Sequence, residues 1–168
     1  QYDDIIKGDL IQTAASRDTL SALNKEGAGA KKQIKVHLKV DTGMGRIGFF
    51  PEELLEVYQL AKKLKNIKIE GLFSHLARAD EEDKEFSYQQ LKRFKSALKE
   101  LEAAGFKLPL LHIANSAAVI DLNKTSLDLV RPGIMLYGLL PSDQLNEQAN
   151  LKPLLAFKTK IVQLRNLP

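Results

Sequence analysis

The chain has 168 residues, 44% of them hydrophobic, which is enough to bury one core, so a single domain is expected by default. It contains no cysteine, which excludes a disulfide framework and a thiolate metal site and fits a cytoplasmic protein. Its net charge of +4 comes from lysines interleaved with glutamates, unlike the clustered basic stripe of a nucleic-acid-binding protein. No apolar run could span a membrane, so neither nucleic acid nor membrane is expected as a partner.

Short apolar or alternating runs predict five strands. The clearest run, 34–40, has an apolar residue at every second position from Val36, whereas His37 and Lys39 would point to the opposite face. The predicted strands cover residues 10–15, 34–40, 67–75, 110–114 and 127–131.

Helices are predicted between these strands. Ser16 would cap the first helix, which would end at Gly27, and Pro51 would open the second at its first turn. The third helix would cover residues 86–104, and a short one would begin at Ser116. Strands and helices that alternate over connections of this length predict a parallel sheet and an α/β fold.

Polar residues recur where four of the predicted strands end. They are Lys39 with Asp41, His75, Asn115 with Ser116, and Arg131 with Gly133. The carboxyl ends of parallel strands converge on one side, which in barrels carries the active site and often a phosphate site. Each residue alone has an ordinary explanation, such as a helix cap for Ser116, but the recurrence favours a functional site.

The pattern of elements is too short for a complete barrel. A closed eight-stranded barrel needs about 250 residues, and five predicted strands do not fill it. The pattern starts mid-way at Gln1 and ends at Pro168, after another strand-like run at 157–164. We therefore expect an internal piece of a larger protein, with a partial barrel over 1–140 and a linker and the start of a second domain over 141–168.

Four motifs occur in a characteristic order: HLKVDTGMGRIG at 37–48, GLFSHLA at 71–77, LHIANSAA at 111–118 and VRPGIMLYG at 130–138. With them, the chain resembles the alanine racemase family, fold-type III enzymes that depend on pyridoxal 5'-phosphate (PLP). The resemblance implies a partial TIM-like (β/α)8 barrel of about strands 4 to 8, followed by the first strand of a C-terminal β domain. It also implies a homodimeric parent protein that interconverts L- and D-alanine for the bacterial cell wall.

The resemblance assigns cofactor-binding roles as well. His75 would lie flat against the pyridine ring of PLP, and Arg131 would face the ring nitrogen, with His112 behind it. Ser116, in one motif with Asn115, would hold the phosphate. The backbone near Gly133 and Ile134 would share that task.

Three further residues receive supporting roles from the resemblance. Arg46 would reach the phenolic oxygen of the cofactor and the carboxylate of the substrate. A carbamylated Lys39 would orient Arg46, and Asp80 would line the substrate entrance. No metal is expected.

The chain departs from the family in its acid–base residues. The family's PLP-binding lysine lies in a motif like VVKANAYG, which does not occur here, and its catalytic tyrosine belongs to a C-terminal domain. We therefore expect the isolated chain to be inactive, and its open barrel to leave Phe73 and Ala114 without packing partners. Two alternatives are a non-catalytic PLP- or phosphate-binding α/β module and another fold-type III enzyme, either a broad-specificity racemase or a decarboxylase.

Overall fold

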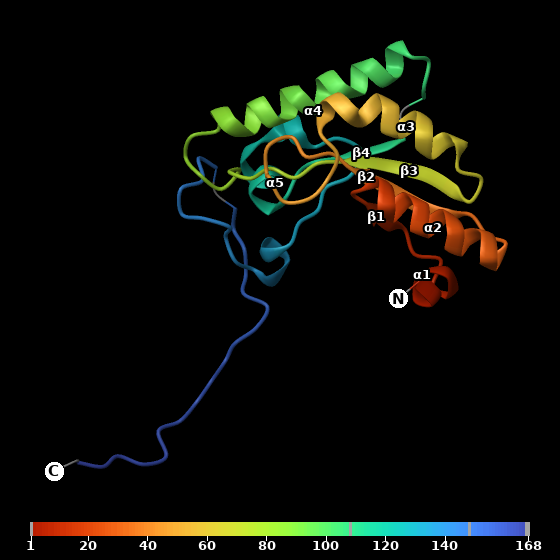
Figure 1. Ribbon diagram of the computed structural model, residues 1–168. Coiled ribbons are helices and arrows are strands. Elements are labelled where there is room, and N and C mark those ends of the chain that lie inside the picture. The colour runs from red at the N-terminus through yellow and green to blue at the C-terminus, as the bar shows by residue number, and fades with distance from the viewer. Residues whose placement is uncertain (1, 108, 148, 167–168) are drawn as a thin grey trace.

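A single parallel sheet organises the computed structural model, which describes residues 2–107, 109–147 and 149–166. Its strands follow one another in the order β1-β2-β3-β4 (Figure 1). They are β1 (Gln12–Ala14), β2 (Ile34–Lys39), β3 (Ile67–Phe73) and β4 (Leu110–His112). All neighbouring pairs are parallel, as the strand–helix alternation predicts.

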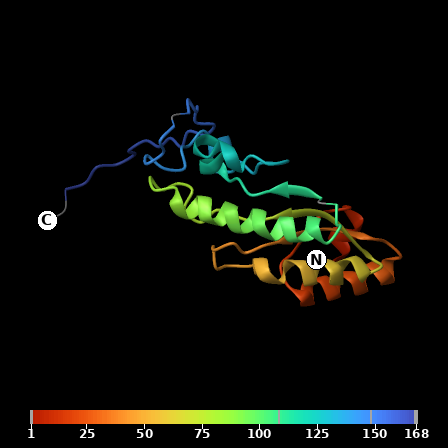
Figure 2. The same cartoon turned by 90° about the horizontal axis from the view of Figure 1, so that it is seen from above.

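The helices form a second layer beside the sheet. Helices α2, α3 and α4 run side by side along it (Figures 1 and 2). The α-helices are α1 (Tyr2–Lys7), α2 (Arg17–Ala30), α3 (Leu54–Lys63), α4 (Glu85–Ala103) and α5 (Ser116–Asp121). Three short 3-10 helices are η1 (Pro51–Glu53), η2 (Asn123–Thr125) and η3 (Ile134–Tyr137). Within the described part of the chain, none of the helices has both the length and the apolar character needed to cross a bilayer.

Strand β2 separates the core from the opposite face of the sheet. Val36 and Leu38 are fully buried on the core side, whereas His37 and Lys39 occupy the alternate positions, as predicted. The partner of Val36 on β3 is Ile69, but the partner of His37 is Gly71, so β3 carries an extra residue there. This irregularity brings Gly71, which has no side chain, alongside the imidazole of His37.

The fifth predicted strand, at 127–131, is reduced to one isolated bridge between Leu129 and His112. The segment still runs beside β4, because Asp128 N–H donates to the Leu111 carbonyl at 3.0 Å and Arg131 N–H donates to the Ala114 carbonyl at 3.0 Å. The Leu111 N–H, however, is taken by the Asp128 carboxylate at 2.8 Å. A side chain therefore replaces a backbone ladder bond and interrupts the strand.

The expected C-terminal strand at 157–164 is also absent from the structure. The described residues after 149 form neither helix nor strand, and the chain extends away from the sheet (Figure 1). Phe157 is 97% exposed, so the apolar residues of this run have no surface to pack on here. The expectation for Ala114 was wrong too, since this residue is 0% exposed, while Phe73 is half-buried among other rings.

Helix α2 begins as predicted but does not end at Gly27. The Ser16 hydroxyl accepts the Thr19 N–H at 3.1 Å, and the helix continues to Ala30, with Lys31 in the left-handed region at its end. A Cβ at Gly27 would lie 2.8 Å from both the Asn66 Cβ and the Lys32 carbonyl oxygen. Gly27 is therefore a close-packing position within the helix and not its stop signal.

Two glycines of α2 provide a matched test of this packing. Alanine normally stabilises a helix interior by about 1 kcal/mol over glycine. We expect Gly29→Ala to raise the free energy of unfolding by about this amount, because nothing lies within 4 Å of its added Cβ. Gly27→Ala should instead lower it by about 1–2 kcal/mol through overpacking. Urea denaturation of both variants would measure the difference, and stabilisation by Gly27→Ala would contradict the packing role.

Candidate functional site

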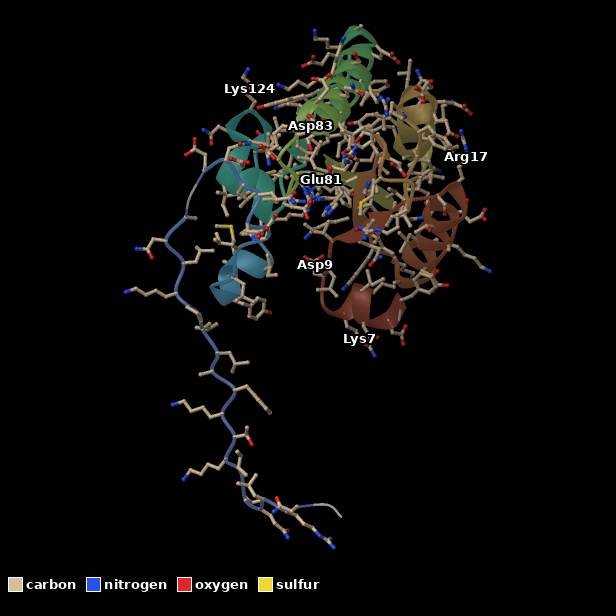
Figure 3. All side chains as sticks on the ribbon, turned by 90° about the vertical axis from the view of Figure 1, so that its left-hand side faces the viewer. Lys7, Asp9, Arg17, Glu81, Asp83 and Lys124 are labelled. Atoms are coloured by element: carbon tan, nitrogen blue, oxygen red, sulfur yellow. The ribbon has the colours of Figure 1, made fainter. Side chains whose placement is uncertain are left out.

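A pocket of about 430 Å³ lies where the carboxyl ends of the strands meet the loops that follow them. Seven predicted site residues line it: His75, Asp80, Asn115, Ser116, Arg131, Gly133 and Ile134. Figure 3 views the molecule from this end, with Glu81 and Asp83 on the charged loop that precedes α4. Three of the four groups of strand-end polar residues thus line one pocket, whereas Lys39 and Asp41 do not line it.

Arg131 lines this pocket, and its guanidinium is hydrogen-bonded to the groups around it. Its Nη2 donates to the carbonyl of Ser74 at 2.9 Å and to that of Ile113 at 3.3 Å. Its Nη1 lies 2.5 Å from Nδ1 of His112, and its Nη2 lies 3.3 Å from Nδ1 of His75. Because a guanidinium can only donate, both histidine nitrogens must be acceptors.

Both histidines are held neutral by their surroundings. Burial first, and then the charge of Arg131, lower the pKa of His75 below its usual value. The same two causes, in the same order, lower the pKa of His112 to about 4. At neutral pH the pocket is therefore lined by His75 as an uncharged flat ring and by Arg131 as a cation next to it.

A carboxylate at the end of β2 organises the glycine-rich loop. Asp41 Oδ1 accepts the N–H groups of Gly43, Met44 and Gly45 at 2.9, 2.8 and 3.1 Å, and its Oδ2 accepts that of Arg46 at 3.1 Å. Burial alone raises the pKa of Asp41, but these hydrogen bonds and the nearby Lys39 charge outweigh it, and the pKa is lowered. Gly43 and Gly45 have φ of 138° and 70°, which glycine adopts without strain.

Lys39 and Arg46 lie beside the pocket without lining it. The Lys39 side chain is buried, with Nζ donating to the Val40 carbonyl at 2.9 Å. Burial lowers its pKa to about 8, with the positive charges of Arg131 and Arg46 adding to this effect and Asp41 opposing it. The side chain of Arg46 is exposed, and its charge also lowers the pKa of His75.

Sequence reasoning missed Gln90, which connects helix α4 to two loops of the site. Its Oε1 accepts the Ala77 N–H at 2.9 Å, and its Nε2 donates to the His75 carbonyl at 3.0 Å and to Thr42 Oγ1 at 3.3 Å. Thr42 in turn bonds the Ser74 hydroxyl at 2.7 Å. The available signal was an amide on the apolar face of α4, where Gln90 is 0% exposed.

The neighbouring glutamines of α4 allow a controlled test of this anchor. Gln90→Met keeps the volume but leaves the Ala77 N–H and the His75 carbonyl without their partner. We expect it to lower the free energy of unfolding by about 1–3 kcal/mol. Gln89→Met is the control, because Gln89 is exposed and, among the described residues, its side chain bonds Glu85 alone, four residues earlier on its own helix. Equal denaturation midpoints for the two variants would show that the Gln90 network contributes nothing.

Comparison with known proteins agrees with this geometry. The profile of the family "Alanine racemase, N-terminal domain" matches residues 1–141. The alanine racemase of Halothermothrix orenii is 48% identical over 168 residues, covering 100% of this chain and 44% of that protein. The alanine racemase of Carboxydothermus hydrogenoformans is 46% identical over 160 residues, covering 95% of this chain and 43% of that protein.

Solved structures show the same relationship. The alanine racemase of Clostridium difficile 630 in complex with cycloserine superposes with a TM-score of 0.85 at 38% identity, over 90% of this chain and 42% of that one. The alanine racemase of Streptomyces lavendulae gives a TM-score of 0.83 at 31% identity, over 90% and 41%. The chain thus spans less than half the length of these relatives, and its parallel α/β sheet fits part of a TIM-like barrel. By its motifs, fold and relatives, this chain belongs to the alanine racemase family and matches its N-terminal part.

Proposed function

We propose that this chain forms the cofactor-binding part of a PLP-dependent alanine racemase. The observation that carries the proposal is the convergence of seven predicted site residues on one pocket, in a chain that belongs to this family. Residues 1–140 would supply about strands 4 to 8 of the barrel. Residues 141–168 would supply the linker and the start of a C-terminal β domain, in keeping with a family match that ends at residue 141.

The donors at one end of the pocket suit a phosphate group. The Gly133 N–H donates to the Ser116 hydroxyl oxygen at 2.7 Å, so the Ser116 O–H can itself donate to an anion, and Ile134 follows at the exposed start of η3. An added Cβ at Gly133 would find only Ser116 Oγ, at 3.9 Å, so an anion has room to approach the backbone. Asn115 would position the Ser116 hydroxyl. Its Oδ1 accepts the Ala118 N–H and so caps α5, and its Nδ2 donates to the Leu76 carbonyl.

The other end of the pocket suits an aromatic ring with an acceptor nitrogen. Every side-chain hydrogen bond that the described residues give Arg131 runs through Nη1 or Nη2, which leaves its Nε–H for a ligand. A guanidinium stays protonated and can only donate, so it would keep the ring nitrogen unprotonated. When bound, PLP supplies a carbonyl that takes the amino group of alanine and a ring that disperses the electrons released by proton removal.

The residues beside the pocket would complete the substrate side. A lowered pKa gives Lys39 a neutral amine fraction near neutral pH, which is the form that reacts with carbon dioxide. The resulting carbamate would replace a cation with an anion next to Arg46 and orient its guanidinium toward the carboxylate of alanine. Asp80, which is exposed at the rim, would line the substrate entrance. The active protein would be a cytoplasmic homodimer.

The proposal predicts that the purified 168-residue chain has no racemase activity. The two acid–base groups of the family lie outside it, and each typically contributes a factor of about 10² to 10⁴. The assay would follow D-alanine with added PLP, in preparations freed of host racemase. Turnover above that of free PLP would contradict the expectation.

A chimera provides the matching positive experiment. This chain would replace the corresponding 44% of the Halothermothrix orenii alanine racemase, and the chimera should racemise alanine. A chimera that folds and binds PLP without racemising alanine would instead support the alternative of a non-catalytic PLP-binding module. Turnover of other amino acids in preference to alanine, or loss of the carboxyl group, would identify a different fold-type III enzyme.

Arg131→Glu in the active chimera tests the role of the guanidinium. A glutamic acid can deliver a proton to the ring nitrogen, whereas Arg131 cannot, and a protonated ring attracts electrons more strongly. We expect slower racemisation and a higher ratio of transamination to racemisation, measured by pyruvate formation. Arg131→Lys is the control, since it keeps a donor-only cation. An unchanged ratio of transamination to racemisation in Arg131→Glu would contradict the proposal that Arg131 keeps the ring nitrogen unprotonated.

A further inference from the structure

All three histidines of the chain belong to one hydrogen-bonded cluster around Arg131. His75 and His112 contact the guanidinium directly. His37 is one step further, with its Nδ1 lying 2.8 Å from Nε2 of His112. The function proposed above gives His37 no role, although it occupies the polar face of β2 opposite the core.

The protons of this cluster are determined by the donor-only chemistry of Arg131. His112 Nδ1 must accept from the guanidinium, so the single proton of a neutral His112 lies on Nε2. That proton is directed at His37 Nδ1, which must therefore accept as well. His37 then carries its own proton on Nε2. One charged group thus specifies the tautomers of two imidazoles in series.

The charges around His37 agree with a neutral ring. Burial is the largest effect on its pKa and lowers it, and the positive charge of Arg131 lowers it further. Glu70 on β3 opposes this by raising the pKa. From β4 the facing titratable group is His112, which is itself held neutral. On its own strand, Lys39 and Lys35 flank it, and Lys35 is paired with Asp9 at 2.5 Å.

Packing contacts hold the two rings in addition to the hydrogen bonds. A Cβ at Gly71 would lie 2.6 Å from three ring atoms of His37, so this imidazole rests directly on the glycine of β3. Phe73 stacks on His112 with ring centroids 4.8 Å apart and an interplanar angle of 6°. The bulge that pairs His37 with Gly71 therefore creates the seat for the ring.

We propose that His37 is a positioning residue that holds Arg131 toward the pocket by way of His112. The imidazole on Gly71 anchors the Nε2–H of His112, and the anchored His112 presents its Nδ1 to the guanidinium. The tautomers and the glycine seat stand on the geometry of this chain alone. Only the benefit to the cofactor rests on the function proposed above.

Nitrogen-15 NMR of the imidazoles in the 168-residue chain tests the tautomers directly. With three histidines, substitution of each in turn assigns the signals. We expect unprotonated Nδ1 and protonated Nε2 in both His37 and His112, and no titration of His112 between pH 8 and pH 5, because its pKa is about 4. A proton on Nδ1 of His37, or a His112 that titrates at or above pH 6.5, would overturn the proposal.

Two replacements of His37 separate positioning from bulk packing. The side-chain carbonyl of His37→Asn can still accept the Nε2–H of His112, whereas His37→Leu cannot. The hydrogen-bonded Nε2 proton of His112 should remain visible in His37→Asn and disappear in His37→Leu. In the chimera, His37→Leu should weaken PLP binding about tenfold, as expected for loss of one hydrogen bond, and His37→Asn should restore most of it. Identical behaviour of the two variants would overturn the positioning role.

A double-mutant cycle tests the glycine seat. Gly71→Ala should lower the urea midpoint of the chain when His37 is present, and should have little effect in the His37→Ala background. Equal shifts in both backgrounds would show that the ring does not rest on Gly71 and would overturn that part of the proposal. If the chimera fails to racemise alanine while the NMR result stands, the proposed function fails and this inference does not.

Discussion

A single half-buried guanidinium connects the carboxyl ends of the strands. Through its side chain Arg131 bonds the carbonyls that follow β3 and β4, and through its own N–H it bonds the Ala114 carbonyl. Removal of a side chain that makes several hydrogen bonds leaves those partners without a donor from the protein. The loops that form the pocket are therefore positioned relative to one another by one side chain, even though the segment that carries it is no longer a regular strand.

Burial first, with the charge of Arg131 adding to it, lowers the pKa of the neighbouring histidines and lysine. His75 and His112 stay neutral beside the guanidinium, and Lys39 has a pKa near 8. The carboxylate of Asp41, which four backbone N–H groups of its own loop hold in place, offsets part of this positive charge and acts on Lys39. Arg131, Arg46 and the protonated fraction of Lys39 together still outweigh this one carboxylate. Such a site favours an anionic ligand, and a phosphate and a carboxylate both satisfy that requirement.

Helix α4 is hydrogen-bonded to the loops that follow β2 and β3. Gln90 reaches from α4 to the loops after β2 and β3, and Arg93 Nη1 donates to the Thr42 carbonyl at 3.1 Å from the same helix. These bonds give the loops fixed partners on a buried, regular element. The described residues after 154 form no helix or strand, and the chain there extends away from the sheet (Figure 1).

The alternation around His37 was sufficient to predict the two faces of β2, and three of the strand-end motifs contain six of the predicted site residues that line the pocket. Both are local patterns, with the period of a strand or the spacing of a motif. The continuation of α2 through Gly27, the loss of the strand at 127–131 and the anchor made by Gln90 depended on contacts with Asn66, Leu111 and Ala77, which no local pattern contains. Only the tertiary structure placed Gly71 under the ring of His37, because a bulge changes which residues of two strands face each other.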